Sequence, residues 1–131
     1  MATIFTKIVR GEIPCYKVAE TDDFLAFLDI RPMVKGHTLC IPKQETDYLF
    51  DLTDELYMGL QLFSREVARA LEKAVPCKRI GVAVIGLEVP HAHIHLMPIF
   101  SVSDLGFGKP PLSFTPDEMA EIAASIRAQL P

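Results

Sequence analysis

The amino-acid sequence predicts one α+β domain: a five-stranded antiparallel sheet with a long helix packed on it and shorter helices near the two ends of the chain. Its 131 residues fit a single domain, and half of them are hydrophobic, which is enough to bury a cooperative core. Apolar residues recur at helical spacing across residues 53–74, whereas shorter apolar runs bounded by turn residues predict strands. The strand candidates are residues 16–20, 24–28, 38–41, 79–85 and 91–99.

The N-terminal part predicts a short helix followed by a hairpin. Residues 3–10 have the apolar spacing of a helix, which Thr3 can cap and Gly11 can end. The Thr-Asp-Asp sequence of residues 21–23 favours a turn, so the first two strand candidates should pair antiparallel. Asp29 follows the second strand, where an aspartate can form a turn simply by bonding its own backbone.

The long helix at residues 53–74 should be capped by Thr53. Its apolar surface is wide, because Met58 and Leu62 lie outside the main stripe, and an exposed stripe of that width usually marks an interface. The main stripe consists of Leu56, Leu60, Phe63, Val67, Ala70, Leu71 and Ala74.

The last two strand candidates should form an adjacent antiparallel pair. Residues 100–113 contain Gly, Ser and Pro and predict an irregular loop, and either Phe107 or Phe114 could cover a neighbouring site. Residues 115–118, Thr-Pro-Asp-Glu, form a capping box with proline at the first helical position. A final amphipathic helix should follow, and we expect residues 1–131 to form one domain.

Charge and cysteine content restrict the partners and the compartment. The net charge is −4 and no basic run is present, so we expect no nucleic-acid partner. Cys15, Cys40 and Cys77 are scattered and form no metal-binding pair, and Cys40 stands in an apolar run typical of a core. With no visible export signal or membrane span, we expect a cytoplasmic protein that does not bind membranes.

The most informative stretch holds three of the four histidines, His91, His93 and His95, at a spacing of two. Side chains alternate between the faces of a strand, so the three imidazoles should share one face, about 6.5–7 Å apart. Burying three imidazoles on one face is costly, which favours a functional surface over an ordinary core strand. The residues that should face the core are Ala92, Ile94 and Leu96.

From the residues alone, three interpretations of this row are open. It could be a core strand that happens to carry histidines. Two histidines at a spacing of two could bind zinc with further ligands from elsewhere in the chain. Alternatively, a neutral imidazole could attack phosphorus while its neighbours bind the phosphate oxygens and the leaving group.

The same stretch resembles a known family. His91-Ala92-His93-Ile94-His95-Leu96-Met97 fits the histidine-triad (HIT) pattern of three histidines alternating with apolar residues, and Gly86-Leu87-Glu88-Val89-Pro90 resembles the Gly-x-x-Val-x sequence that leads into it. Residues 4–14, 24–32 and 36–43 resemble the opening and central segments of Hint-type members. The resemblance covers residues 4–98 and implies the HIT-like form of the α+β fold.

The resemblance implies that the chain binds a purine nucleotide or nucleoside phosphoramidate. Ile4, Phe5 and Ile8 would form a wall against the base. Asp29 would accept hydrogen bonds from the ribose hydroxyls, which suits a carboxylate with two acceptor oxygens. His37 would lie behind the triad and fix the tautomer of the histidine that it bonds. The other nucleotide-binding residues implied are Phe27, Leu28, Ile30, Gly86 and Glu88.

The resemblance also implies a nucleotidyl-histidine intermediate. His93 should attack the α-phosphorus, since an ordinary imidazole, with a pKa of about 6.5, is mostly neutral at physiological pH. His95 should bind a non-bridging oxygen, and His91 should hold the second ring nitrogen of His93. We expect no cofactor and no metal, because the imidazoles are spread along one strand. In addition, Thr3 and Thr6 replace cysteines with which many relatives bind zinc.

The match departs from Hint-type relatives at Leu87 and Glu88, where they often carry a glutamine and a serine or threonine that contact phosphate or the leaving group. Leucine makes no such contact, and a carboxylate near phosphate is repulsive unless it is protonated or turned away. The predicted function is hydrolysis of nucleoside 5′-phosphoramidates or related nucleotidyl esters. A dinucleoside polyphosphate hydrolase, a purine nucleotide-binding module with little turnover and a metal-dependent enzyme are the alternatives. Hint-type relatives are homodimers, so a homodimer through the long helix and an adjacent strand is expected.

Overall fold

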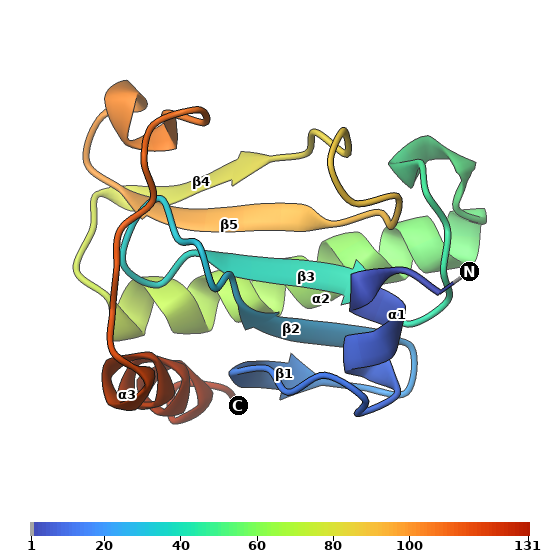
Figure 1. Cartoon of the computed structure of the whole chain (residues 1–131), viewed down its shortest axis with the longest axis horizontal. Coiled ribbons are helices and arrows are strands. Elements are labelled where there is room, and N and C mark those ends of the chain that lie inside the picture. Colours follow the sequence, from blue (N-terminus) through green and yellow to red (C-terminus); the bar gives the residue numbers. More distant parts are fainter. Residues whose placement is uncertain (1) are drawn as a thin grey trace.

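A computed structural model describes residues 2–131 and contains the predicted five-stranded antiparallel sheet (Figure 1). The strand order is β1-β2-β3-β5-β4, so β1 and β4 are the two edges. The strands are β1 (Lys17–Glu20), β2 (Phe24–Leu28), β3 (Thr38–Pro42), β4 (Arg79–Ala83) and β5 (Ile94–Ile99). The helices are α1 (Ile4–Val9), α2 (Asp54–Ala74) and α3 (Pro116–Arg127), with short 3₁₀ turns at Leu49–Asp51 and Val102–Leu105. The predicted α+β architecture is confirmed.

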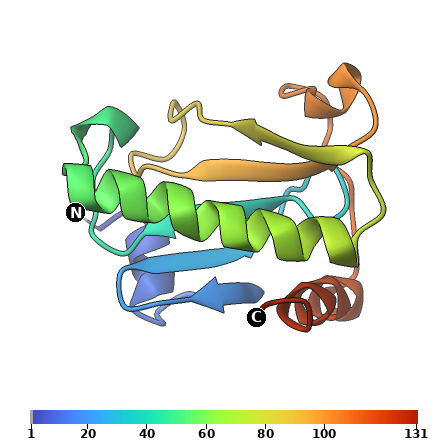
Figure 2. The ribbon, with the colours of Figure 1, turned by 180° about the vertical axis from the view of Figure 1, so that it is seen from behind.

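The sheet separates two apolar clusters. The long helix α2 crosses one face, and α3 lies beside the sheet next to β1 (Figure 2). On the opposite face, α1 lies over one end of β2 and β3 (Figure 1). The larger cluster, on the α2 face, includes Ala92, Ile94 and Leu96, as their alternation with the histidines predicted. The smaller cluster, on the α1 face, consists of Phe5, Leu25, Phe27, Leu39 and Ile41.

The long helix forms where its apolar spacing predicted. The Thr53 hydroxyl caps it by accepting a hydrogen bond from the Leu56 amide, and Asp54 and Glu55 stand in its first turn. Met58 and Leu62 are more than half exposed, so the second apolar face is uncovered in the single chain. The residues buried against the sheet are Leu60, Phe63, Ser64, Val67, Ala70 and Leu71.

The prediction of a strand from residue 91 is wrong, because β5 begins at Ile94. Its pairing with β3 ends at the Cys40–Ile94 pair. The backbone before it bonds to a different segment: the Ala92 amide donates to the Thr46 carbonyl at 2.7 Å. That bond turns residues 91–93 away from the β3 ladder, so only His95 of the three triad histidines lies within a strand. The neighbouring strand β4 likewise ends at Ala83, two residues earlier than predicted.

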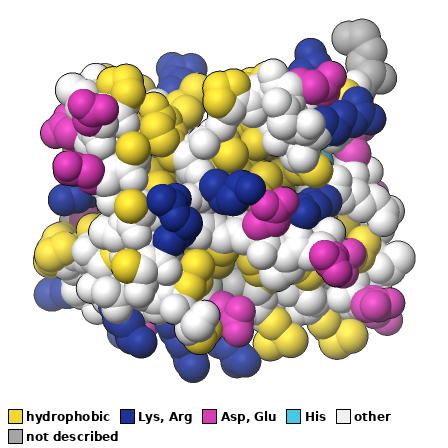
Figure 3. Space-filling view, turned by 90° about the horizontal axis from the view of Figure 1, so that it is seen from below, with side chains coloured by type: hydrophobic (Ala, Val, Ile, Leu, Met, Phe, Trp, Pro, Cys, Tyr) yellow, Lys and Arg dark blue, Asp and Glu magenta, His cyan; other side chains and the backbone are white. Residues whose placement is uncertain are grey.

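The C-terminal part agrees with the predicted capping box. Thr115 and Glu118 bond each other's backbone amides, with Pro116 in the first helical turn. Met119, Ile122, Ala123 and Ile126 are buried on α3, which is the expected amphipathic helix, whereas Leu130 lies beyond its end. On the side of the molecule that carries β1 and α3, basic and acidic side chains are interspersed with apolar ones (Figure 3). None of the helices described has the length and apolar composition needed to cross a bilayer.

Candidate active site

All four histidines gather on the α1 face of the sheet, where each is at most 7% exposed. The three triad imidazoles are thus buried, and burying polar rings is costly. The cost is offset because each ring has at least one hydrogen-bond partner. The rings of His93 and His95 also meet edge-on, with centroids 4.9 Å apart. This is closer than the spacing of about 6.5–7 Å expected along an ideal strand.

His93 is oriented by backbone and not by a neighbouring imidazole. Its Nδ1 lies 2.7 Å from the main-chain oxygen of His91, and since a carbonyl can only accept, this nitrogen carries the proton. The Nε2 atom of His93 is then an unprotonated imidazole nitrogen. The predicted role of the His91 side chain is thus corrected: its carbonyl holds His93, while its ring turns toward Pro42, whose carbonyl accepts from Nε2 at 2.8 Å.

His37 lies behind the triad as predicted, and its partner is His95. The Met33 amide donates to His37 Nδ1 at 3.1 Å, so the proton of the neutral ring is on Nε2. That Nε2 donates to His95 Nδ1 at 2.8 Å, which places the remaining proton of neutral His95 on its Nε2. The Met33 amide, acting through the ring of His37, therefore keeps a proton on Nε2 of His95, which makes that nitrogen a hydrogen-bond donor.

The electrostatics favour the neutral forms of His37, His91 and His95. Burial lowers the pKa of His37, although the Asp29 carboxylate acts in the opposite sense. Burial also lowers the pKa of His91, partly offset by the bond to the Pro42 carbonyl. For His95, burial together with the neighbouring His37 and His93 rings lowers the pKa to about 3. Neutral rings at physiological pH are what the tautomers above require.

Phe5 is the member of the predicted base wall that touches the histidines. Its ring meets those of His93, Phe27 and His91 edge-on, at centroid distances of 5.1, 5.5 and 5.8 Å. Ile8 packs beside this cluster, while Ile4 is 47% exposed.

Phe107 covers the other side of the site. From the loop after β5, its ring lies 5.1 Å from that of His95 and 6.5 Å from that of His37, edge-on in both cases. Of the two phenylalanines that could cover the site, Phe107 therefore contacts the histidines, whereas Phe114 packs against the larger core.

The structure brings only part of the predicted nucleotide-binding set to this face. Asp29 Oδ2 lies 3.7 Å from His37 Nε2, and Oδ1 accepts from the Arg31 amide in a turn. Leu28 does not reach the site, since its side chain is buried in the larger core on the α2 face. The remaining predicted residues, Ile30, Gly86 and Glu88, lie in loops, with Ile30 and Glu88 exposed.

Among residues 2–131, one group of side chains is spaced closely enough to hold a metal ion. The ligand atoms of Asp29, His37 and His95 all lie within 4.8 Å of one another. A metal ion between the two rings would have to displace the proton that His37 donates to His95. With a metal ion on Nε2, the neutral His37 ring would carry its proton on Nδ1. That nitrogen could then not accept the hydrogen bond from the Met33 amide. Metal-independent activity stays a prediction, and the hydrogen bonds give it a physical basis.

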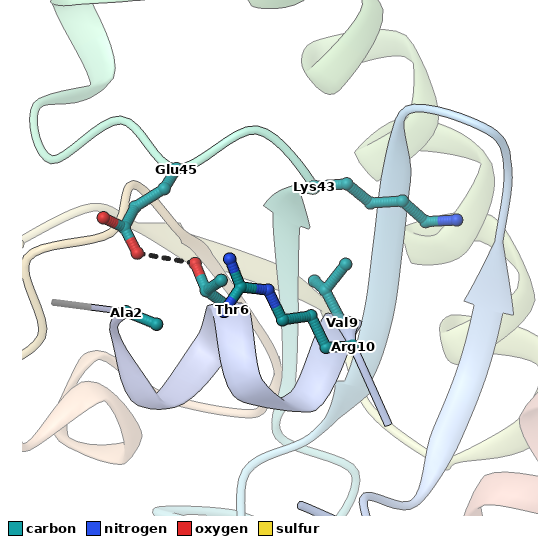
Figure 4. A pocket seen from close by; sticks show the side chains of 6 residues that line it. All are labelled: Ala2, Thr6, Val9, Arg10, Lys43 and Glu45. Carbon is teal, nitrogen blue, oxygen red and sulfur yellow. Dashed lines mark hydrogen bonds between the residues drawn. The ribbon is translucent and has the colours of Figure 1, made fainter. Parts of the chain in front are cut away.

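Several residues that build the site were not predicted for it. Met33 acts through its backbone amide, which leaves no trace in the side-chain pattern. Glu45 bonds Thr3, the cap of α1, and Thr6 on α1. Glu45 and Thr6 also line a cavity of about 460 Å³ (Figure 4). The sequence predicts Thr3 as a helix cap and both threonines as replacements for cysteines, yet both also approach the ring of His91.

Known proteins resemble this chain in sequence and in fold. The chain matches the family model of the HIT domain over residues 10–102. It is 35% identical over 133 residues to the adenosine 5'-monophosphoramidase hnt1 of Schizosaccharomyces pombe, covering 99% of each chain. It is 37% identical over 98 residues to the adenosine 5'-monophosphoramidase HNT1 of Saccharomyces cerevisiae, covering 74% of this chain and 62% of that protein.

Among solved structures, a Hit-like protein involved in cell-cycle regulation from Bartonella henselae aligns with a TM-score of 0.84 and 34% identity, covering 98% of this chain and 96% of the other. The family model spans most of the chain and the match to the fission-yeast protein spans nearly all of it. The chain therefore belongs to the HIT domain family.

Proposed function

We propose that this protein hydrolyses nucleoside 5′-phosphoramidates, or related nucleotidyl esters, through a nucleotidyl group carried on His93. The observation that supports this most directly is the proton assignment: Nδ1 of His93 donates to a carbonyl, which leaves a lone pair on Nε2. A neutral imidazole held with one nitrogen free is a suitable nucleophile for phosphorus. The names of the two yeast relatives, both adenosine 5'-monophosphoramidases, support the same reaction class.

The reaction has two displacements. In the first, His93 Nε2 forms a bond to the α-phosphorus, the phosphorus–nitrogen bond to the leaving amine breaks, and the amine takes a proton from water. In the second, the resulting hydroxide or a water molecule bonds to phosphorus, and the bond to Nε2 breaks to release the nucleoside 5′-monophosphate. Throughout, the Nε2 proton of His95 is a hydrogen bond donor to a non-bridging oxygen, where negative charge develops.

His95 serves as a donor and not as the acid that protonates the amine. If it gave up its Nε2 proton, the side chain among residues 2–131 that is bonded to it and could supply a replacement is His37. His37 already accepts the Met33 amide on its other nitrogen, so losing its proton would leave an imidazolate. The low pKa of His95, about 3, also disfavours a doubly protonated ring that could act as an acid.

In this proposal Asp29 binds the ribose hydroxyls, and Phe5, Ile8 and Phe27 contact a purine base. Asp29 is partly exposed and retains acceptor capacity beyond its bond to the Arg31 amide. The edge of Phe5 against the His93 ring would set the distance between the base and the nucleophile.

A binding module with little turnover is the second candidate, and one observation favours it. Leu87 is 87% exposed and Glu88 is also exposed, so the loop before the triad offers an apolar and an anionic side chain where relatives use polar ones. A weakly held leaving group would slow the first displacement without preventing nucleotide binding.

Incubation with an adenosine phosphoramidate, a diadenosine polyphosphate and AMP separates the candidates. The proposed enzyme cleaves the phosphoramidate, and a quenched reaction analysed by mass spectrometry carries one nucleotidyl group on His93. His93→Ala should lose several orders of magnitude in turnover, as expected for a lost nucleophile, while still binding AMP. Binding without cleavage would favour the module, preferential cleavage of the diadenosine compound would favour the polyphosphate hydrolase, and an adduct elsewhere would end the assignment.

A further inference from the structure

A hydrogen-bond network runs from the exposed Glu45 through the buried Thr3 and Thr6 to the His91 ring. We call Thr3, Thr6, Glu45 and the His91 ring the threonine network. Thr3 Oγ1 lies 2.9 Å from His91 Nδ1, and Thr6 Oγ1 lies 3.4 Å from the same nitrogen. The Thr6 hydroxyl and the Thr3 amide meet Glu45 Oε1 at 2.7 and 2.9 Å. Figure 4 shows the Glu45 carboxylate reaching across to Thr6 on α1.

The direction of every proton in the network follows from its fixed ends. His91 Nε2 donates to the Pro42 carbonyl, so Nδ1 of the neutral ring must accept. A carboxylate also only accepts, so the Thr6 proton goes to Glu45. The donor left for His91 Nδ1 is then the hydroxyl of Thr3, whose oxygen lies closer to that nitrogen, at 2.9 Å, than to its other acceptor, Thr6 Oγ1, at 3.2 Å.

The Thr3 hydroxyl performs two tasks at once. While it donates to His91, its oxygen accepts from the Thr6 amide and so caps α1. A hydroxyl can donate and accept together, which neither a carboxylate nor an aliphatic side chain can do. The Glu45 carboxylate is held in its charged form, because the hydrogen bonds from Thr6 and Thr3 lower its pKa.

This network ends on the residue that orients the nucleophile. The main-chain oxygen of His91 accepts the Nδ1 proton of His93, and the next amide, that of Ala92, donates to Thr46, which follows Glu45 in the chain. Helix α1 and its cap therefore both contact the site: the cap residue Thr3 bonds His91, and Phe5 packs edge-on against His93. A shift of the His91 ring would carry with it the carbonyl that selects the tautomer of His93.

We propose that Thr3 is the positioning residue for His93. Its hydroxyl holds His91 in one neutral tautomer and thereby fixes the carbonyl that orients the nucleophilic ring. Glu45 sets the direction of the network by taking the proton of Thr6. The kinetic part of this inference rests on the proposed function, whereas the tautomers can be measured without substrate.

The test compares Thr3→Val, which removes the hydroxyl at nearly constant volume, with Thr3→Ser, which keeps it. In Thr3→Val, long-range ¹H–¹⁵N NMR should show His91 and His93 as mixtures of tautomers, where wild type has single ones. The maximal rate of phosphoramidate cleavage should fall about 10- to 100-fold with little change in KM, as for a nucleophile displaced by about 1 Å. Thr3→Ser should restore both the single tautomers and the rate.

Thr3→Val also removes the cap of α1, so a second variant guards against unfolding. Thr3→Asp caps a helix as well as threonine does but has no proton to donate to His91. It should show the same loss with α1 intact by circular dichroism. Single tautomers and a wild-type rate in either folded variant would overturn the inference. If the wild-type protein binds AMP without cleaving any substrate, the proposed function fails, and the tautomers alone then decide for or against the role of Thr3.

Discussion

At the scale of residues, the site works because backbone groups decide which imidazole nitrogen carries a proton. The His91 carbonyl leaves Nε2 of His93 free, and the Met33 amide, acting through His37, leaves a proton on Nε2 of His95. The two rings thus present opposite hydrogen-bonding character, a lone pair and a donor, on one face. That pairing suits attack on phosphorus with stabilisation of the developing charge.

The ribose role of Asp29 can be separated from the chemistry. Asp29→Ala should weaken AMP binding about 10- to 100-fold, the loss expected for charge-assisted hydrogen bonds, and should lower kcat less than binding. Isothermal titration with AMP and steady-state kinetics measure the two effects. Asp22→Ala, in the exposed turn between β1 and β2, is the matched control and should bind AMP normally. Unchanged AMP affinity in Asp29→Ala would leave Asp29 only its turn-forming bond to the Arg31 amide.

At the scale of elements, the turn that begins β3 holds His37 in place. Gly36 has a φ of +86°, in the left-handed region, and an added Cβ would lie 3.1 Å from both Leu71 and Val75 and 3.3 Å from Pro98. The turn is therefore wedged between the end of α2 and β5. Because His37 is the next residue, the position of this turn sets the bond to His95.

Gly36→Ala should lower the free energy of unfolding by about 2–4 kcal/mol, combining the cost of a left-handed backbone with overpacking. Gly11→Ala is the matched control, because Gly11 has a φ of +78° but nothing within 4 Å of an added Cβ. It should cost only about 1–2 kcal/mol. Urea unfolding of both variants at one protein concentration measures the difference, and equal losses would show that the contacts around Gly36 relax without cost.

At the scale of the whole molecule, the buried histidines make stability depend on pH. The pKa values of His37, His91 and His95 are lowered by burial, that of His95 to about 3, while in the unfolded chain each titrates near 6.5. Below about pH 6.5 the unfolded state therefore binds more protons than the folded state. The stability that the three neutral histidines give the folded state is fully present above about pH 6.5 and is lost as the pH falls.

Urea unfolding should thus show that the free energy of unfolding decreases as the pH is lowered from about 6.5 to about 5, above the range in which most carboxylates titrate. Each histidine whose pKa is fully displaced from this range contributes up to about 1.4 kcal/mol per pH unit. His95→Gln should reduce the slope, because it removes the most strongly shifted of these groups. A stability that stays level or rises on acidification would contradict neutral buried rings.

The expected homodimer also belongs to this scale. β4 is an edge strand with Val82 exposed, Val84 and Ile85 follow it exposed, and Met58 and Leu62 on α2 are exposed as well. An open strand edge and an apolar helix face both favour association. Light scattering at micromolar concentration should give twice 14.6 kDa, about 29 kDa.

Val82→Lys combined with Leu62→Glu should convert the dimer to a monomer while the circular dichroism spectrum is kept, because charges would be buried on both surfaces. A monomer mass for the wild-type protein would contradict the prediction and leave these apolar side chains facing solvent.

Several features followed from the sequence by itself because they depend on local periodicity and capping. The alternation around His93 placed Ala92, Ile94 and Leu96 in the core, and the threonines before α2 and α3 cap them as predicted. Such patterns state which face of an element a side chain occupies, since 3.6-residue and two-residue periods are properties of the element alone.

The partners of those histidines were decided only by the tertiary structure. The carbonyl of Pro42, 49 residues from His91, and the hydroxyl of Thr3, 88 residues away, reach its ring because β3 and α1 meet the segment before β5. Residues 91–93 lie outside β5, where the Ala92 amide bonds the Thr46 carbonyl, and all three triad imidazoles are buried. A periodic pattern gives the face but not the donor or acceptor across from it, and for imidazoles that opposing group decides which nitrogen can react.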